Sequence, residues 1–413
     1  MREAPPFDKN LGMWYYAIDT CPSGGVIRKQ VEDFVVEEVL KDGTVVSRDG
    51  MSLAPSPGGW MWIHVVKRNV DTLKLVIRLA RTLGVGRRDI SIGGIKDARA
   101  VTSQIISIRG NVATLPQVPN VNFLDMWPMD RPITPGEIYG NKFTIVLRDV
   151  EHMECAQEAL ERLKNTAIPN YYGYQRFGTI RPVSHLLGRA LLRKDPEGFF
   201  HIMFCTIFPH ESEKARRSRE LACRGEYSRA LESFPKRFIE ERAVLKKLAA
   251  GSDLWNAIMA IPLEILRIYV EAAQSYLFNV YLSKRMELAP LDTPIEGDLV
   301  EINGQVSYYI EGLGGSVVLP VVGVGVRMPR GKVGAAILDT LKREGLNPDA
   351  FLKMPRGLQV YGFYRKTQVE IKDLTYSVAA GYVAIQFILP RGSYATTVLR
   401  EIVKPTEPSA HGF

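Results

Sequence analysis

The order of apolar and polar residues along the chain predicts both strands and helices. Short apolar or alternating runs typical of strands occur at residues 26–28, 34–39, 60–66, 102–108, 143–148, 369–371 and 382–388. Apolar residues at helical spacing occur at residues 71–83, 151–166, 214–247 and 265–286. The two kinds of element mix without a strict βαβ rhythm, which favours an α+β fold over a doubly wound sheet.

The first long helix has signals at both ends. Asn69 or Asp71 can cap its start, and Gly84 can end it. Its expected apolar stripe is formed by Leu73, Val76, Ile77 and Ala80. A second face is basic and carries Lys74, Arg78 and Arg81. Such a face is usually only solvated, although it could also meet phosphates.

Composition shifts along the chain predict a discontinuous domain. A stretch with five prolines, residues 116–135, is expected to be a loop that leads to Asn141. After Arg181 the chain becomes rich in Lys and Arg and helical in pattern, and strand-like runs return near the end. We therefore predict one domain from residues 1–180 and 357–413, interrupted by an inserted domain at 181–356 of roughly 175 residues.

Length and charge narrow the class of protein. The chain has 413 residues, enough for two or three domains, and a formal net charge of +8 with pI about 9.2. This balance favours a polyanionic partner such as nucleic acid, although solvated lysines alone would also produce it. No stretch approaches the roughly 18 apolar residues of a membrane span, so we expect a soluble, cytoplasmic protein. Without a heptad pattern we expect a monomer.

The cysteines and histidines show no metal or catalytic pattern. The four cysteines form no C-x-x-C pair and have no His at zinc-site spacing; they are Cys21, Cys155, Cys205 and Cys223. We expect them to be reduced thiols, and we expect no metal. The six histidines fall in no triad. The glycines near Gly312 lack both the P-loop and the dinucleotide-binding pattern, which disfavours nucleotide-dependent and redox enzymes.

Residues 91–104 carry the strongest candidate for chemistry and read SIGGIKDARAVTSQ. Asp97 lies between Lys96 and Arg99, after a glycine pair and before a predicted strand. The glycines allow a tight turn or a close approach to a partner, and the cations favour an ionised carboxylate. An Asp in a glycine-rich turn more often bonds its own backbone. Local chemistry alone leaves both roles open.

Five segments, in the same order, resemble the tRNA pseudouridine synthase D (TruD) family. They are VEDFVVEE at 31–38, GGIKDARAVTSQ at 93–104, GNKFTIVLR at 140–148, PNYYGYQRFG at 169–178 and LPRGSYATTVLRE at 389–401. These segments span nearly the whole chain, which argues against a chance match. The resemblance implies a pseudouridine synthase core with a mixed, largely antiparallel sheet flanked by helices, and an inserted α/β domain specific to the family.

The same resemblance implies a reaction and a nucleophile. Pseudouridylation detaches uracil from its ribose and rejoins it through C5, with no net redox change, so we expect no cofactor. Asp97 matches the family's nucleophile. The expected substrate is tRNA, with uridine 13 as the target that the family name implies. Three roles remain open for the carboxylate: attack at the ribose C1′, attack at the base C6, and assistance of glycosidic cleavage alone.

Further residues are assigned by the family motifs. Asn170 matches an active-site asparagine, and Tyr172 matches an aromatic residue, often Phe, that stacks on the target base. Arg28 matches a basic position, commonly Lys, and is the expected charge partner of Asp97, although its neighbour Lys29 could take that place. Lys96, Arg99 and Arg391 are expected to support the site or contact RNA.

Two other functions remain as alternatives. A non-catalytic RNA-binding or RNA-folding protein on the same scaffold would share the basic charge and the aromatics. A nucleotide-dependent RNA modifier would need a phosphate loop, which the sequence lacks. The intact Lys96-Asp97 pair, together with Asn170 and Tyr172, favours the enzyme.

Overall fold

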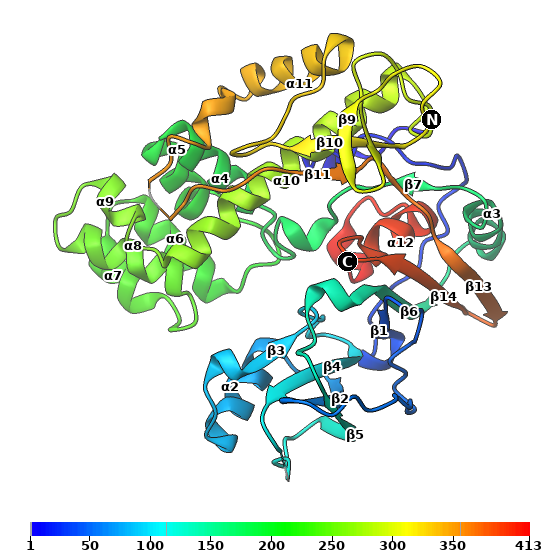
Figure 1. Cartoon of the computed structure of the whole chain (residues 1–413). Coiled ribbons are helices and arrows are strands. Elements are labelled where there is room, and N and C mark those ends of the chain that lie inside the picture. Colours follow the sequence, from blue (N-terminus) through cyan, green and yellow to red (C-terminus); the bar gives the residue numbers. More distant parts are fainter. Residues whose placement is uncertain (1, 113, 356) are drawn as a thin grey trace. The chain divides into compact units, whose positions relative to one another are not determined.

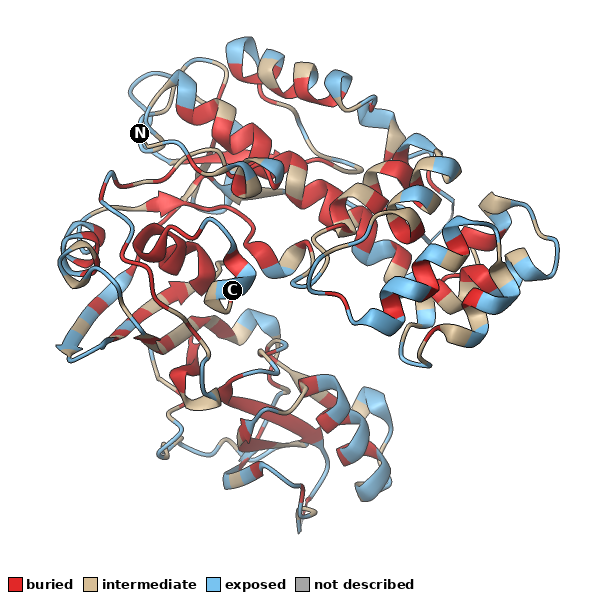
Figure 2. Cartoon of the chain, turned by 180° about the vertical axis from the view of Figure 1, so that it is seen from behind, coloured by how far each residue is buried: buried red, intermediate tan, exposed pale blue. Residues whose placement is uncertain are grey.

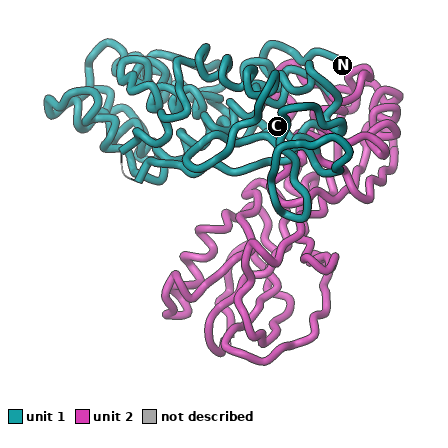
Figure 3. The backbone as a smooth tube through the Cα atoms, turned by 45° about the horizontal axis from the view of Figure 1, so that its top comes forward, with its two compact units in different colours: residues 1–16, 169–368, 413 teal, residues 17–168, 369–412 magenta. Residues whose placement is uncertain are grey.

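The chain forms two compact units in the computed structural model, which describes residues 2–112, 114–355 and 357–413 (Figure 3). Unit 1 comprises residues 1–16, 169–368 and 413, and unit 2 comprises residues 17–168 and 369–412. A short ribbon of β7 (Ile168–Pro169) and β12 (Gln368–Val369) forms where the chain passes between them. The predicted domain boundaries at 180/181 and 356/357 stay a prediction.

Unit 2 is built on one large sheet (Figure 1). Its strands are β1 (Phe34–Leu40), β2 (Trp60–Arg68), β3 (Ile90–Ile92), β4 (Val101–Arg109), β5 (Val121–Met129), β6 (Ile138–Arg148), β13 (Lys372–Ala379) and β14 (Tyr382–Pro390). The order is β13-β14-β6-β1-β4-β2-β5, with β3 added beside β4. All these pairs are antiparallel except β1 with β4, which is parallel.

Helices flank this sheet. They are α2 (Thr72–Leu83), α3 (Met153–Leu163) and α12 (Ala395–Val403), and the short 3-10 turns are η1 (Val31–Asp33), η2 (Arg87–Asp89), η3 (Pro135–Glu137) and η7 (Pro408–His411). Apolar residues of α2 pack with those of β2, β3 and β4 in one core cluster. A second cluster, which includes Trp62 and Trp127, uses residues of β2 and β4 that alternate with those of the first, together with Trp127 and Met129 of β5.

Unit 1 is organised around the long helix α10 (Leu263–Leu288), which is buried along most of its length (Figure 2). Its other helices are α1 (Pro6–Asn10), α4 (Ser184–Arg193), α5 (Pro196–Phe200), α6 (Glu213–Cys223), α7 (Tyr227–Ser233), α8 (Ile239–Ala249), α9 (Leu254–Ile258) and α11 (Gly331–Arg343). A four-stranded antiparallel sheet has the order β11-β10-β8-β9. Its strands are β8 (Leu299–Ile302), β9 (Gln305–Tyr308), β10 (Ser316–Val321) and β11 (Phe363–Lys366). Three short turns are η4 (Tyr174–Arg176), η5 (His201–Cys205, a π turn) and η6 (Pro348–Ala350).

The predicted α+β class with a mixed, largely antiparallel sheet is confirmed, and three local predictions are wrong. Residues 26–28 form no strand, because Arg28 has a left-handed backbone with φ 56°. The proline-rich stretch contains β5 rather than only loop. Pro128 fits there because β5 is an edge strand, where a missing N–H leaves no ladder bond unmade.

The third correction concerns the buried face of α2. The helix starts after Asp71, whose side chain accepts a bond from the Lys74 amide, and ends at left-handed Gly84, as predicted. Its buried residues, however, are Thr72, Leu75, Val76, Leu79 and Ala80. Leu73 and Ile77 are 41% and 46% exposed. Both sets fit an i, i+3, i+4, i+7 pattern, so spacing alone could not separate them.

The cysteines are paired, so the prediction of reduced thiols is wrong. Cys21 bonds Cys155 within unit 2, and Cys205 bonds Cys223 within unit 1. Their Cα–Cα distances of 5.4 and 5.2 Å lie in the usual disulfide range. The partners are separated by 134 and 18 residues, and no local sequence pattern links them. Only the fold brings them together.

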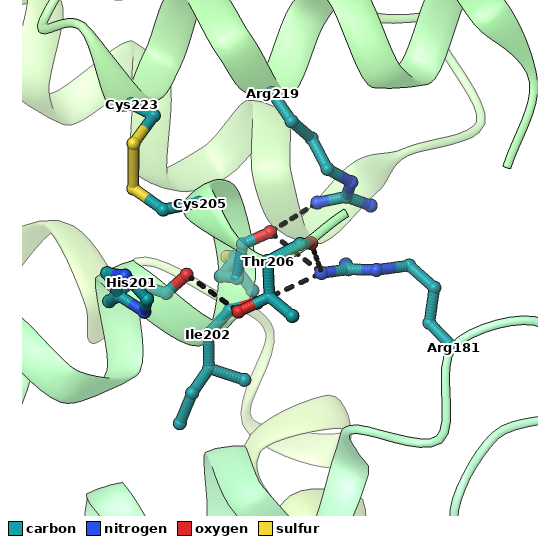
Figure 4. The surroundings of a disulfide bond; sticks show 8 residues. Arg181, His201, Ile202, Cys205, Thr206, Arg219 and Cys223 are labelled. Carbon is teal, nitrogen blue, oxygen red and sulfur yellow. Dashed lines mark hydrogen bonds between the residues drawn. A yellow bond between two sulfur atoms is a disulfide. The ribbon is translucent and has the colours of Figure 1, made fainter. Parts of the chain in front are cut away.

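The second disulfide lies beside an arginine cluster (Figure 4). Cys205 ends the π turn η5, and Arg181 donates from Nη2 to the carbonyl oxygens of Ile202, Met203 and Thr206. Arg219 also donates to the Met203 carbonyl. Burial, together with the nearby Arg219, lowers the pKa of Arg181 to about 10. These bonds satisfy the carbonyl groups that a helix end leaves without partners.

Among the described residues, no helix combines the length and the apolar composition that crossing a bilayer requires.

Candidate active site

Asp97 lies in the loop between β3 and β4, on unit 2. Its carboxylate is 32% exposed, so it is held by the protein and still open to solvent. Gly93 precedes it in the loop. A Cβ atom at Gly93 would lie 2.5 Å from the Ile138 side chain, so the glycine permits close packing against β6.

Arg28 lies beside Asp97, and its role as the charge partner stays a prediction. Its Nη2 lies 3.7 Å from Oδ2 of Asp97, and its side chain is only 5% exposed. The guanidinium stacks 3.8 Å above the Phe34 ring, and Nη1 donates to the Gly412 carbonyl. Burial lowers the pKa of Arg28, and the charge of Asp97 opposes that shift. Lys29 instead pairs with Asp149 at 2.6 Å.

A second buried cation lies beneath the Asp97 loop. The Lys67 ammonium donates to the backbone carbonyls of Val70, at 2.8 Å, and Asp97, at 3.2 Å. Lys67 is fully buried at the end of β2. Burial lowers its pKa to about 8, and the charge of Asp97 opposes the shift. Lys67 therefore fixes the backbone of the candidate nucleophile and places positive charge near it.

Lys96 supports the loop and has little contact with solvent. Its Nζ lies 2.8 Å from Oε1 of Glu38, and the two side chains are 6% and 0% exposed. The other Glu38 oxygen accepts a bond from the Ile105 amide of β4. The Lys96 amide donates to Oγ1 of Thr72, at the start of α2. The loop is thus tied to β1, β4 and α2.

The remaining predicted cations of unit 2 are exposed. Arg99 lies two residues after Asp97, and its charge contributes to the lowered pKa of Arg28. Arg391 donates from Nη1 to the Pro135 carbonyl at 2.6 Å, and its backbone amide bonds the Tyr139 carbonyl. Both side chains can still reach a polyanion from these positions.

Asn170 and Tyr172 lie in unit 1, where Arg365 links them. Asn170 accepts from Arg365 Nη2 at 2.5 Å and donates to the Lys366 carbonyl at 3.0 Å. The same guanidinium lies 4.3 Å from the centroid of the Tyr172 ring, and Phe278 meets that ring edge-on at 5.6 Å. Arg365 therefore covers one side of the predicted stacking ring.

The backbone of Tyr172 is held by a buried amide. Asn279 on α10 accepts from the Tyr172 amide at 2.8 Å and donates to its carbonyl at 3.1 Å. Asn279 also donates to the Leu11 carbonyl and has no exposed surface. A buried amide with several partners fixes a single geometry.

The site residues thus fall into two groups. Within unit 2 the structure brings together Asp97 and Arg28, with Lys96 and Arg99 on the same loop. Asn170 and Tyr172 form the unit 1 group.

Sequence reasoning missed Lys67, Glu38, Asn279 and Arg365. A signal existed for Lys67, since alternation along β2 places it on the buried face of Ile63 and Val65. Polar residues in the apolar pattern of α10 were a signal for Asn279.

Comparisons with known proteins agree on one class. The family model described as tRNA pseudouridine synthase D (TruD) matches residues 10–402. A curated Pyrobaculum arsenaticum protein named "Probable tRNA pseudouridine synthase D" is 70% identical over 413 residues and is matched over the full length of both chains. A Halobacterium salinarum protein of the same name is 32% identical, and the match covers 98% of this chain and 99% of that protein.

A solved structure matches as well. The crystal structure of a Methanosarcina mazei protein named as a tRNA pseudouridine synthase D matches with a TM-score of 0.78 and 26% identity, covering 99% of this chain and 100% of that chain. These comparisons define the class of the protein as an RNA-modifying enzyme, a pseudouridine synthase. More particularly, the chain belongs to the tRNA pseudouridine synthase D family, as its motifs predicted.

Proposed function

We propose that this protein isomerises uridine to pseudouridine in tRNA, at position 13, with Asp97 as the nucleophile and without a cofactor. The observation that carries the proposal is the pairing of a partly exposed Asp97 carboxylate with a buried Arg28 guanidinium 3.7 Å away. A buried, stacked cation therefore places a fixed positive charge next to a solvent-accessible carboxylate, which is a group that can act as a nucleophile.

In the proposed reaction the N1–C1′ bond of uridine breaks and a C5–C1′ bond forms. The proton on C5 is lost and N1 gains one, so the product is an isomer of the substrate. Asp97 assists cleavage by attacking the ribose or the base. Lys67 holds the Asp97 carbonyl through the reaction, and Lys96 holds the loop through Glu38. Fixed groups of this kind lower the cost of reaching the transition state.

Asn170 and Tyr172 supply the base-binding half of the proposal. Tyr172 is 7% exposed and Arg365 covers one side of its ring, so in this proposal the target base stacks on the other side, a contact worth about 1–3 kcal/mol. Its backbone, held by Asn279, keeps the ring in place. Basic side chains such as Arg99 and Arg391 would contact phosphates and offset the few kcal/mol needed to expose a paired uridine.

The test is carbodiimide mapping of pseudouridine on unmodified tRNA transcripts. We expect the wild-type protein to form one new pseudouridine at position 13, and we expect Asp97→Asn to form none while binding the transcript with similar affinity. Asp130→Asn, an exposed carboxylate on the same unit with 51% side-chain exposure, is the matched control and should retain full activity. Substantial turnover by Asp97→Asn would reject the nucleophile.

The second candidate is a non-catalytic RNA-binding protein on the same scaffold. It predicts tRNA binding with no pseudouridine in any lane.

We also propose that the enzyme works as a cytoplasmic monomer, without a metal. Sedimentation of the purified protein, with and without tRNA, checks the oligomeric state.

A further inference from the structure

Unit 1 contains a pocket that the proposed roles of its residues do not explain. It has a volume of about 320 Å³ and lies between α10 and the chain around β10 and β11. We call it the α10 pocket. It is lined by Tyr172, Arg176, Arg267, Glu271, Gln274, Ser275, Val321, Val360, Tyr361 and Phe363. One end therefore reaches the predicted base-stacking residue, Tyr172.

Two aromatic rings at this pocket are open to solvent. Tyr361 is 77% exposed and Phe363 is 49% exposed. Single exposed apolar residues are common on protein surfaces and need no explanation. Here two aromatic side chains, separated along the chain by Gly362, line one pocket that also has polar walls, and stacking surfaces for bases use such an arrangement.

The backbone that carries Tyr361 is held in place. The Val324 amide donates to the Val360 carbonyl, and the Gly362 amide donates to the Val324 carbonyl. Gly323 and Gly362 pack so closely that a Cβ atom at Gly323 would lie 2.5 Å from the Gly362 nitrogen. The buried Gln274 side chain, which also lines the pocket, donates to the Val322 carbonyl at 2.7 Å. Tyr361 is thus an exposed ring on a fixed backbone, so binding a partner has to order the side chain but not the backbone.

The charge at the pocket suits an anion. Arg176 bonds Ser275 and pairs with Glu271 at 3.2 Å, so these two charges balance. Arg267 is exposed on α10 and, within the described part of the chain, makes no ion pair within 4 Å. Among the described lining residues, the Arg267 guanidinium therefore has no ion-pair partner and shares its pocket with the two exposed aromatic rings, a combination that can hold a base by stacking and a phosphate by charge.

We propose that the α10 pocket binds an unpaired nucleotide of the tRNA substrate, with its base stacked on Tyr361 and Phe363 and its phosphate at Arg267. This inference rests on the proposed function for the identity of the RNA. It adds a second nucleotide-binding position on unit 1, formed by Tyr361, Phe363 and Arg267 in a pocket that Tyr172 also lines. Recognition there is by stacking and charge, so it tolerates different bases.

The test measures affinity for an unmodified tRNA transcript by filter binding at several salt concentrations. Tyr361→Ala should weaken binding by about 5- to 150-fold, the range expected for one lost base stack. Tyr361→Phe retains the π face and should bind within about twofold of wild type. Ile310→Ala removes another exposed side chain of unit 1, with 62% exposure, and should change nothing. Arg267→Gln should reduce the slope of log affinity against log salt by about 0.7–0.9.

The outcomes separate this inference from the proposed function. If Tyr361→Ala binds the transcript with wild-type affinity, and the wild-type protein still forms pseudouridine, the inference alone is overturned. That result would point to a protein partner for the exposed rings. Weaker binding by Tyr361→Ala, without pseudouridine in any lane, would support the pocket and reject the enzyme reaction. Equal melting temperatures of all variants show that lost affinity does not reflect unfolding.

Discussion

At the scale of single residues, the candidate site rests on two buried cations around one carboxylate. Arg28 meets the Asp97 side chain, and Lys67 meets the Asp97 backbone. Moving such charges out of water is costly, and the protein offsets this cost with specific contacts: a Phe34 ring and a carbonyl for Arg28, and two carbonyls for Lys67. The two cations therefore differ in what their removal should change.

Arg28→Lys should lower the rate of pseudouridine formation. A lysine retains the positive charge but has no planar guanidinium to stack on the Phe34 ring. Its single ammonium group also cannot contact both the Asp97 carboxylate and the Gly412 carbonyl as the two guanidinium nitrogens do. Loss of one charge-assisted contact, about 1.5–3 kcal/mol, corresponds to about a 10- to 150-fold slower step. Single-turnover kinetics with excess enzyme measure this. Lys29→Arg, whose partner is Asp149, should remain at the wild-type rate.

Lys67 should make stability depend on pH in a defined window. Its folded pKa is about 8, below the ordinary value of 10.5, so between these values the unfolded chain holds a proton that the folded chain has lost. Below pH 8 the folded protein bears the cost of a buried charge. As pH rises from about 8 to 10.5, that cost disappears and stability increases, by up to on the order of 3 kcal/mol.

Chemical denaturation of wild type and Lys67→Met across this window checks the sign. The difference in unfolding free energy, wild type minus variant, should increase with pH. A constant difference would show that Lys67 keeps an ordinary pKa in the folded protein.

At the scale of elements, α2 shows where sequence patterns succeed and where they stop. Asp71 and Gly84 marked its ends because capping depends on one local side chain or one local backbone conformation. Which apolar stripe is buried depends on where β2 and β4 lie, and the helix sequence alone does not contain that information. The same reason explains β5: its pairing partner, β2, is distant along the chain.

A pair of leucines on α2 tests the corrected face. Leu75→Ala should lower the free energy of unfolding by about 2–5 kcal/mol, because Leu75 is 1% exposed within a core cluster. Leu73→Ala, at 41% exposure, should stay within about 0.5 kcal/mol of wild type. Equal effects would contradict the burial of one face only.

In the candidate site too, short sequence motifs could be recognised from the sequence, whereas contacts between residues far apart in the chain could not. The five motifs identified the family and pointed to Asp97, Arg28, Asn170 and Tyr172, because a family's short signatures are contained in the sequence itself. Arg365 lies far from Asn170 along the chain, so only the paired strands and loops of unit 1 reveal their contact. The chemical roles of all these residues stay predictions until the variants are measured.

At the scale of the whole molecule, each unit contains one disulfide, and the two close loops of very different length. In the chain-entropy model, cross-linking a loop of 134 residues stabilises by about 5 kcal/mol, and one of 18 residues by about 3 kcal/mol. The double variant Cys21→Ser/Cys155→Ser should therefore lose more stability than Cys205→Ser/Cys223→Ser. Denaturant midpoints under non-reducing conditions provide the comparison.

Reducing agent is the control for this prediction. It should lower the midpoint of the wild type and leave a variant that lacks all four cysteines unchanged. A larger loss from the short loop than from the long one would show that local packing around Cys205 outweighs chain entropy.

The pairing of β14 with β6 has a consequence for biosynthesis. β6 ends at Arg148, whereas β14 begins at Tyr382, near the end of the chain. While the ribosome makes the intervening residues, β6 has an open edge that only the last part of the chain can cover. The nascent protein therefore cannot complete this sheet until β14 has been synthesised, and such long-range pairing is slow to form. A truncation before β14 should yield an aggregation-prone chain rather than a smaller working enzyme.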